Sequence, residues 1–537
     1  MKRPVKLLVG FADGLLFVLV GLFLLTPICS AASANQTNGP EKALSYSKLD
    51  TNPYYKELKN FHPEGVTNAQ CIKCHKKRDP GIVAQWEHSV HATTKKNKAG
   101  CVECHVVPKD YPTALKGKVC PFAKNSGKNW SIAVAVSSVT CAKCHKKEVD
   151  QFLNSGHSRA AAQWLAPNGT KHGFLMTKLA FNYEELKGDN PTFGVPGKKM
   201  AGGIRKDSPV FAANQKTPEL ADLGVANTCI QCHGTMIKLN KNGVPDPSTW
   251  PNDGVASLYP DGGVGNCNAC HTRHGFSTAE AREPAACANC HLGPDHPDIE
   301  VFDSSVHGHI FATHKAEYNF ATDKQIPGKT IVGPTCFTCH MSGINGLKAT
   351  HNISLRLKWN LWAPKSNERS KGYETAGWAW WSNKKVLRGN PLAGNPLGPD
   401  AARTQMKKVC AACHEATFID NFFARVDAQI INYNKYFEQA DKMLKELKAK
   451  KLIKSDVWSD PFFKLYYYLW HHDGRRMRQG AAMGSPDFAH WHGVFIVMQD
   501  IREMQDIYNY RMRMLKKLKD PKKVLQEEPP IAVVPHN

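Results

Sequence analysis

The most regular hydrophobic pattern of this chain lies in its C-terminal part, between residues 416 and 520. Apolar side chains recur there every three or four residues, the spacing that gathers them on one face of an α-helix. Two further helical stretches are predicted over 461–479 and 488–519, followed by a flexible tail over 521–537. The region therefore predicts a bundle of long helices. The apolar positions of its first helix are Phe418, Phe422, Val426, Ile430, Tyr433, Phe437, Ala440, Leu444 and Leu447.

Residues 35–415 show no comparable long period. Glycine, proline and asparagine interrupt this part of the chain, as in 188–203 and 242–265, and such stretches are typical of loops. We expect short helices and irregular chain here, with one strand pair around Trp130–Val139. The predicted fold class is mainly α, with an irregular first domain over 35–415 and a helix bundle over 416–520.

The first 34 residues have the features of a secretory signal peptide. Three basic residues within the first six precede a largely apolar stretch, and small residues follow around Ala32 and Ala34. An uncleaved anchor is the alternative, and Cys29 is a poor match to a lipoprotein site. No other segment approaches the roughly 20 apolar residues of a membrane helix. We therefore expect an exported protein without a stable membrane span. Its compartment would be the periplasm or an equivalent.

Cysteine and histidine carry the chemical signal. Of the 18 cysteines, 16 lie in eight copies of Cys-x-x-Cys-His, the attachment signature of c-type haem. The two thiols form thioethers to haem, and the histidine becomes the proximal iron ligand. One copy alone could be a redox or zinc dithiol, but eight copies exclude a disulfide scaffold and predict eight covalent haem c groups. The copies are Cys71-Cys74-His75, Cys101-Cys104-His105, Cys141-Cys144-His145, Cys229-Cys232-His233, Cys267-Cys270-His271, Cys287-Cys290-His291, Cys336-Cys339-His340 and Cys410-Cys413-His414.

The formal net charge of +23 has a simple explanation in this light. Haem propionates are anionic, and lysine and arginine are their natural counter-charges. A basic chain otherwise suggests nucleic acid or an anionic membrane as partner. A positive surface that attracts a small anionic substrate or an acidic redox partner accounts for the excess better, so no nucleic-acid binding is expected.

Electron-transfer haems take a second axial ligand, and sixteen of the 24 histidines lie outside the motifs. Three of these share a pattern: an aromatic residue, a serine three positions later and the histidine two further. We expect each to bind a haem other than the one it follows, because 12 to 16 residues separate it from the preceding motif. His471 and His490 are alternatives to the last two of the weaker candidates. The patterned residues are Trp86-Ser89-His91, Phe152-Ser155-His157 and Phe302-Ser305-His307, and the weaker candidates are His274, His351, His472 and His492.

One haem must keep an open position if the protein is an enzyme, because a saturated iron cannot bind substrate. Asp295 and His296 closely follow His291, and a carboxylate beside an imidazole can move protons near neutral pH. The segment Gly-Pro-Asp-His-Pro is also typical of an ordinary surface turn, which spacing alone favours. Cys120 is the odd thiol outside the signal segment, and a small buried side chain is its simplest interpretation.

Several motifs together resemble the octahaem hydroxylamine oxidoreductase family. Besides the eight haem motifs, they are Cys-His-Leu-Gly-Pro-Asp-His-Pro at the sixth motif and Cys-His-Met-Ser-Gly at the seventh. Near the C-terminus, Trp-His-His-Asp-Gly-Arg-Arg at 470–476 is followed by Pro-Asp-Phe-Ala-His-Trp-His-Gly at 486–493. The resemblance covers nearly all of the chain after the signal segment.

The resemblance implies a homotrimer in which seven bis-histidine haems conduct electrons to one catalytic haem. Carried over to this sequence, the catalytic haem is attached at Cys229, Cys232 and His233, and Asp295 and His296 are the distal acid–base residues. This reverses the interpretation from spacing alone.

One position departs from the oxidising members of that family. Those members have a tyrosine that makes covalent bonds to the catalytic haem of a neighbouring subunit, whereas this chain has Phe488. Phenylalanine has no phenol oxygen and cannot form that bond. Tyr466, Tyr467 and Tyr468 lie upstream and are expected to be helix-face aromatics. Members without the tyrosine look like reductases, and this chain resembles such members, as in the nitrite-reducing paralogues of anaerobic ammonium oxidisers, for which the compartment would be the anammoxosome lumen.

The sequence therefore predicts an exported octahaem oxidoreductase that reduces nitrite to nitric oxide or ammonium. A c-type cytochrome, or a cytochrome subunit, is the expected electron donor. Oxidation of hydroxylamine or hydrazine at the same haem is the first alternative. A non-catalytic electron conduit with saturated haems is the second.

Overall fold

The computed structural model describes residues 49–95, 98–116, 129–160, 229–235, 237–322, 324–367, 398–456 and 459–533. All of them belong to one compact unit that begins at Gly39. The predicted signal segment, Cys29, Cys120 and the stretch 188–203 lie outside the described residues, as does the side chain of Cys229. Within the described ranges, no helix is long and apolar enough to cross a membrane.

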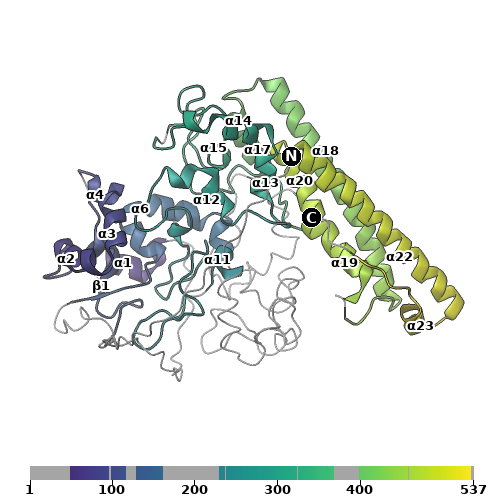
Figure 1. The fold of residues 1–537 in the computed structure, drawn as a ribbon, viewed down its shortest axis with the longest axis horizontal. Helices are drawn as coiled ribbons and strands as arrows, with labels where there is room; N and C mark the ends of the chain where they lie inside the picture. Colours follow the sequence, from purple (N-terminus) through teal and green to yellow (C-terminus); the bar gives the residue numbers. More distant parts are fainter. Residues whose placement is uncertain are drawn as a thin grey trace, which may run out of the picture. The chain divides into compact units, whose positions relative to one another are not determined.

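The part of the chain that carries the haem motifs consists of short helices joined by irregular segments (Figure 1). Several of these helices begin at a side-chain cap, such as Thr67, Ser89 and Ser305, whose hydroxyls accept hydrogen bonds from backbone N–H groups of the first turn. The helices are η1 (Leu49–Thr51), α1 (Pro53–Lys59), α2 (Asn68–Arg78), α3 (Pro80–Glu87), α4 (Val90–Thr93), α5 (Cys101–His105), α6 (Ser138–Leu153), η3 (His157–Arg159), α11 (Cys229–His233), η5 (Cys267–Ala269), η6 (Glu280–Arg282), α12 (Pro284–Ala288), α13 (Asp298–Asp303), α14 (Val306–His314), η7 (Lys315–Glu317), α15 (Cys336–His340) and α17 (Pro399–Cys410).

The strand pair differs from the sequence prediction. Strand β2 (Trp130–Ile132) lies where strands were expected, but its antiparallel partner is β1 (Val106–Pro108), with Val106 opposite Ile132. Residues from Ser138 onward are helical instead, because the Ser137 hydroxyl accepts a hydrogen bond from the Val139 N–H and caps helix α6. The pair therefore joins two segments that are distant in sequence.

The C-terminal part forms the expected long helices. Helix α18 lies alongside α22, and α19 and α20 pack against them (Figure 1). The first turn of α18 buries Ile419 and Phe423 rather than Phe418, which is 49% exposed and stacks on His414 with ring centroids 4.5 Å apart. The elements are α18 (Ala416–Ala449), α19 (Pro461–Tyr468), η10 (Leu469–Asp473), α20 (Gly474–Met483), α21 (Pro486–Ala489), η11 (His490–Phe495), α22 (Ile496–Leu518) and α23 (Pro521–Gln526).

Two π-helical turns interrupt helices that the periodicity predicted as continuous. Element η10 contains His471 and His472, and η11 contains His490 and His492. Such turns insert extra backbone into a helix and occur frequently at functional sites. Both turns thus coincide with the histidine-rich motifs that the sequence singled out.

The predicted flexible tail is in part a packed element. Residues 521–526 form α23, and Val524 on this helix is fully buried. Beyond it, Glu528 accepts hydrogen bonds from the buried Arg511 guanidinium at 2.7 and 2.8 Å, and Arg511 also pairs with Asp460 at 3.0 Å. Burial of these charges as a hydrogen-bonded network fixes the segment through Glu528 on the bundle.

Candidate haem cavity and active site

The haem motifs present their reactive atoms on one side of a helical turn. Seven of the eight motifs lie wholly or partly in α-helices, where residues three and four positions apart share a face. Both thiols and the following imidazole of a Cys-x-x-Cys-His sequence consequently project in one direction. This local geometry is what attachment to a single planar group requires.

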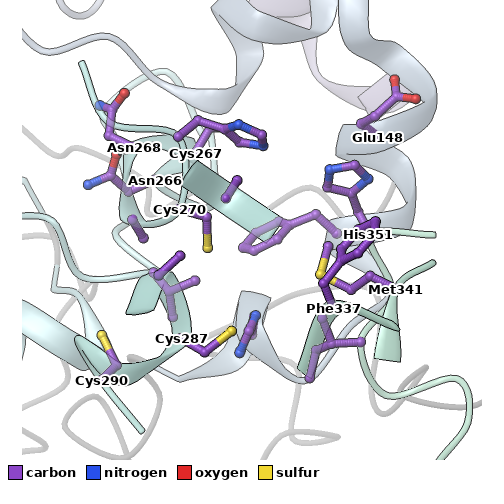
Figure 2. Close-up of a pocket in the computed structure, with 18 of the residues that line it drawn as sticks. Glu148, Asn266, Cys267, Asn268, Cys270, Cys287, Cys290, Phe337, Met341 and His351 are labelled. Carbon is purple, nitrogen blue, oxygen red and sulfur yellow. Dashed lines mark hydrogen bonds between the residues drawn. The ribbon is translucent and has the colours of Figure 1, made fainter. Parts of the chain in front are cut away.

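Most of these side chains line one cavity of about 1890 Å³. A site for a single small-molecule ligand usually has roughly 300–1,000 Å³, so this cavity is large enough for several groups. Figure 2 shows Cys270 and Cys287, from two different motifs, facing the same space, with His351 on another side of it. Apolar residues such as Phe337 and Met341 complete the wall. Thiols, imidazoles and apolar walls are the lining that covalent haem c requires.

Imidazole pairs provide a second test of the fit to haem. Two imidazoles that bind one metal ion from opposite sides through bonds of about 2 Å keep their ring centroids roughly 6 Å apart. Among the described residues, five pairs with this spacing join a motif histidine to a predicted distal histidine, and a sixth joins His291 to His296 at 6.4 Å. In each of the five, the distal histidine meets a motif other than the one it follows in sequence. The pairs are His91–His145 (6.1 Å), His105–His274 (6.3 Å), His157–His291 (5.9 Å), His271–His351 (6.4 Å) and His307–His414 (6.2 Å).

The aromatic–serine–histidine pattern has a structural explanation. In the first and third cases the serine hydroxyl donates to the carbonyl of the aromatic residue and caps the next short helix. His91 and His307 then occupy the second position of α4 and α14. The Ser155 hydroxyl instead accepts from the His157 N–H at 3.0 Å. The serine therefore turns the chain so that the histidine projects from a fixed point.

Hydrogen bonds orient several motif histidines. The Nδ1 atoms of His105 and His233 lie 2.8 and 3.3 Å from the carbonyls of Ala133 and Ala160. A carbonyl only accepts, so Nδ1 carries the hydrogen and Nε2 is left to bind a metal. Carboxylates take this role for two others, with Asp79 at 2.7 Å from His75 and Asp298 at 2.6 Å from His291. The sequence analysis did not identify either carboxylate.

Burial controls the protonation of these imidazoles. It lowers the pKa of His157 to about 3, and the pKa values of His233 and His274 to about 4. The neutral imidazole is the form that binds a metal ion, so these rings are ready for ligation over a wide pH range. For His291, burial acts in the same direction, but the hydrogen bond and charge of Asp298 raise its pKa to about 9.

Thiols of different motifs also contact each other. These contacts show that the first motif adjoins the second, the third adjoins the fifth, and the sixth adjoins both the fourth and the seventh. These contacts gather seven of the motifs into three groups, and haems attached within one group would lie next to each other. The contacting thiol pairs are Cys71–Cys101, Cys141–Cys267, Cys232–Cys290 and Cys287–Cys336.

Asp295 and His296 both line the cavity near the fourth motif. Gly293, with φ +89°, allows the turn that carries them away from His291. Their charges act on His233: burial is the main cause of its low pKa, His296 lowers it further, and Asp295 opposes this. The His296 Nδ1 lies 2.6 Å from the Leu292 carbonyl and therefore carries a hydrogen. The turn thus places its acid–base pair in the cavity.

Arg475 fixes the backbone around this pair. Its Nη1 donates to the Asp295 carbonyl at 3.1 Å and lies 3.5 Å from the Asp295 carboxylate. Its Nε and Nη2 donate to the Trp362 carbonyl at 3.2 and 2.8 Å, and the Trp362 ring lies 5.7 Å from that of His296. The buried His471 lies 3.7 Å from Asp295 on the same side. Two residues of the sequence motif at 470–476, His471 and Arg475, therefore contact Asp295 of the acid–base pair.

The remaining predicted distal ligands, His472 and His492, do not pair with a motif histidine in the described residues. His472 contacts the rings of Tyr467 and Tyr468, and His492 contacts Phe488 at 4.9 Å between ring centroids. Neither ring meets a motif imidazole in the ranges that the structure describes. Tyr467 stacks on His471 at 4.6 Å, so one of the three consecutive tyrosines borders the candidate active site. Tyr466 instead donates to Asp441 within the helix bundle.

Comparison with known protein families agrees with this chemistry. A family model described as "Seven times multi-haem cytochrome CxxCH" matches residues 262–385, and one described as "Cytochrome c554 and c-prime" matches residues 140–186. A probable nitrite reductase–hydroxylamine oxidoreductase fusion protein of Kuenenia stuttgartiensis is 26% identical over 438 residues. The match covers 78% of this chain and 42% of the relative, so this chain spans less than half the length of that protein.

Two solved structures share the fold. A hypothetical multiheme protein has a TM-score of 0.63 at 23% identity, with 87% of this chain and 99% of the other covered. The reducing HAO-like protein complex of Kuenenia stuttgartiensis has a TM-score of 0.52 at 19% identity, with 89% and 93% covered. The chain is therefore mainly α-helical, matches multihaem cytochrome c family models over residues 140–186 and 262–385, and is similar in fold to HAO-like multihaem proteins.

Proposed function

We propose that this protein is an octahaem cytochrome c that reduces nitrite at the haem attached through Cys229, Cys232 and His233. One observation carries the proposal: Asp295 and His296 line the same cavity as His233 and act on its pKa. The other motifs would hold seven electron-transfer haems, with the five imidazole pairs as axial ligands of five of them. A haem at the fourth motif supplies electrons one at a time and a coordination position for a small nitrogen oxyanion.

Nitrite reduction consumes protons as well as electrons, and residues of this chain can deliver the protons. His296 keeps the hydrogen on Nδ1 through its bond to the Leu292 carbonyl, so its Nε2 is the atom that takes up and releases a proton. The Asp295 carboxylate lies 3.6 Å from the His296 Nδ1, beside the imidazole that would transfer the proton. Arg475 holds Asp295 in place through both its backbone and its carboxylate.

Phe488 supports the reductive direction. The oxidising members of the resembling family have a haem-linked tyrosine at this position, and the phenylalanine ring packs on His492 with no oxygen to form such a bond. The similar Kuenenia complex is described as a reducing HAO-like protein, which agrees with this direction, whereas the fusion protein is named for both nitrite reductase and hydroxylamine oxidoreductase.

The compartment and partners form part of the proposal. Haem c is attached outside the cytoplasm, so we infer export and a c-type cytochrome as donor. We also infer a homotrimer from the family resemblance. The similar Kuenenia structure is a complex of a HAO-like protein, which is compatible with a further subunit that donates electrons.

The experiment is steady-state nitrite reduction by the haem-loaded protein with an artificial electron donor. His296→Gln should lower kcat by roughly 10²–10⁴-fold, the usual contribution of a general acid or base, without changing the haem content. His314→Gln is the matched control, because this exposed histidine pairs only with Glu317 and lies outside the cavity. Equal rates for the wild type and the His296 variant would contradict the assigned role, and absence of nitrite turnover in the wild type would contradict the function.

A further inference from the structure

Arg356 is a fully buried cation beside the seventh motif. Only 1% of its surface is exposed, and it lines the haem cavity. Its guanidinium donates to the carbonyls of Thr338 at 3.4 Å and Cys339 at 3.0 Å, and to those of Ser342 and Lys348. Its Nε has no acceptor. In the described part of the chain, no carboxylate forms an ion pair with it.

Two other buried guanidinium groups of this protein lie beside carboxylates. Arg511 pairs with Asp460 and Glu528, and Arg475 lies beside Asp295. Arg478 has no such carboxylate, but its guanidinium lies 3.9 Å from the centre of the Tyr433 ring and each of its nitrogens has an acceptor. A buried charge without a counter-charge costs several kcal/mol, about the whole margin that keeps a domain folded. Arg356 differs from Arg478 in its Nε, which has no acceptor among the described residues, and an anion that enters the cavity would satisfy both this donor and the charge.

We propose that Arg356 binds the propionate carboxylate of a haem. The carboxylate would accept from Nε and restore charge balance at a site that four carbonyls hold rigidly in place. The vinyl groups that bond to cysteines and the propionates lie on opposite edges of the porphyrin. Arg356 contacts the Cys339 backbone at the attachment edge of the seventh motif. The propionate it binds therefore belongs to the haem of a neighbouring motif.

The inference rests on the proposed haem attachment but not on nitrite reduction. A positive charge near a haem favours its reduced form, so loss of the Arg356 charge should lower the midpoint potential of one haem. The test is a spectroelectrochemical titration of haem-loaded Arg356→Gln, without substrate, with haem content measured by intact mass. We expect one potential to fall while the others and the haem number stay unchanged. Because no turnover is measured, failure of this inference is distinguishable from failure of the proposed function.

Arg356→Lys separates charge from geometry. It keeps the charge but replaces the planar fork by a compact ammonium, so a smaller fall in the same potential is expected. If the Arg356→Gln protein does not accumulate, the midpoint potentials of the Arg356→Lys protein alone test the inference. Arg478→Gln is the matched control, because it removes a buried guanidinium outside the cavity and should leave every potential unchanged. Unchanged potentials in the Arg356 variants would overturn the inference. A shift that depends on chloride or nitrite concentration would also overturn it, by assigning the site to a free anion.

Discussion

The motif region and the C-terminal helices bury their side chains in different ways. In the C-terminal part, residues from Tyr433 to Val524 form a continuous apolar core that joins the helices α18, α19, α20, α22 and α23. In the motif region, small apolar clusters, such as the one around Tyr111 and Val139, surround a cavity of about 1890 Å³. The comparison shows that covalent haem replaces side-chain core in the first region, whereas the second is an ordinary helix bundle.

Helix length follows the same division. Helix α18 has 34 residues, whereas the motif helices α5, α11 and α15 have five each. An isolated helix shorter than about 12–15 residues is marginal in water, because nucleation is costly and few hydrogen bonds follow. The motif helices therefore depend on what they pack against, and that includes the attached haems.

The largest expected effect comes from a chain produced without haem attachment. The motif region would lose the groups that fill its cavity and should become open to protease, whereas residues 416–528 should persist longer as a helical fragment. Limited proteolysis with mass spectrometry of the fragments measures this. Equal protease resistance of both regions in the haem-free chain would remove the basis of the comparison.

A core substitution in the helix bundle should lower the stability of the fold without changing haem attachment. Leu447 is fully buried, so Leu447→Ala should lower the free energy of unfolding by about 2–5 kcal/mol and leave the haem content unchanged. Ile431 lies on the same helix with 46% of its surface exposed, so Ile431→Ala should change the free energy of unfolding by less than about 0.5 kcal/mol. Denaturant titrations followed by circular dichroism test both. Loss of haem from Leu447→Ala would show that the regions are not independent in this respect.

Replacement of one distal histidine should affect a single haem. His307 pairs with His414, so His307→Ala should convert one low-spin signal to high spin in the electron paramagnetic resonance spectrum. His309 follows on the same helix and is exposed, and His309→Ala should leave the spectrum unchanged. An unaltered spectrum of the His307 variant would refute this ligand assignment.

A smaller effect is expected from a buried carboxyl pair in the bundle. Burial raises the pKa of Asp473 to about 7, and burial together with the charge of Asp473 raises that of Asp500 well above its usual value. The folded state holds protons that the unfolded chain releases above about pH 4. The pair therefore stabilises the fold at low pH, and this contribution is lost as the pH rises through the raised pKa values.

Asp500→Asn removes this titration and keeps a hydrogen-bond donor for Asp473. The melting temperature should vary less between pH 5 and 8 than in the wild type, and it should be equal or higher at pH 8. Asp506→Asn, at an exposed position of α22, should keep the wild-type pH dependence. A variant at position 500 with unchanged pH dependence would show that the pair does not titrate in this range.

The sequence predicted the parts of the fold that follow from local rules. The spacing of apolar residues predicted α18 nearly to its ends. The haem motifs and the aromatic–serine–histidine pattern identified many of the side chains that line the cavity. Local rules did not reveal the partner of strand β2, the π-helical turns or the packed segment after Lys519, because these depend on contacts between distant residues. The hydrogen-bond partners Asp298 and Arg475 were also missed, although a carboxylate seven residues after His291 was visible in the sequence.

The central claim is that one haem among electron-transfer haems is open to substrate at the fourth motif. Electron paramagnetic resonance of the oxidised protein, before and after addition of nitrite, tests this most directly. The account predicts one high-spin haem signal that nitrite alters, together with low-spin signals that nitrite leaves unchanged, and loss of the nitrite response in a variant that lacks attachment at Cys232. A spectrum with only low-spin haems, unaffected by nitrite, would contradict the account and identify the protein as an electron conduit.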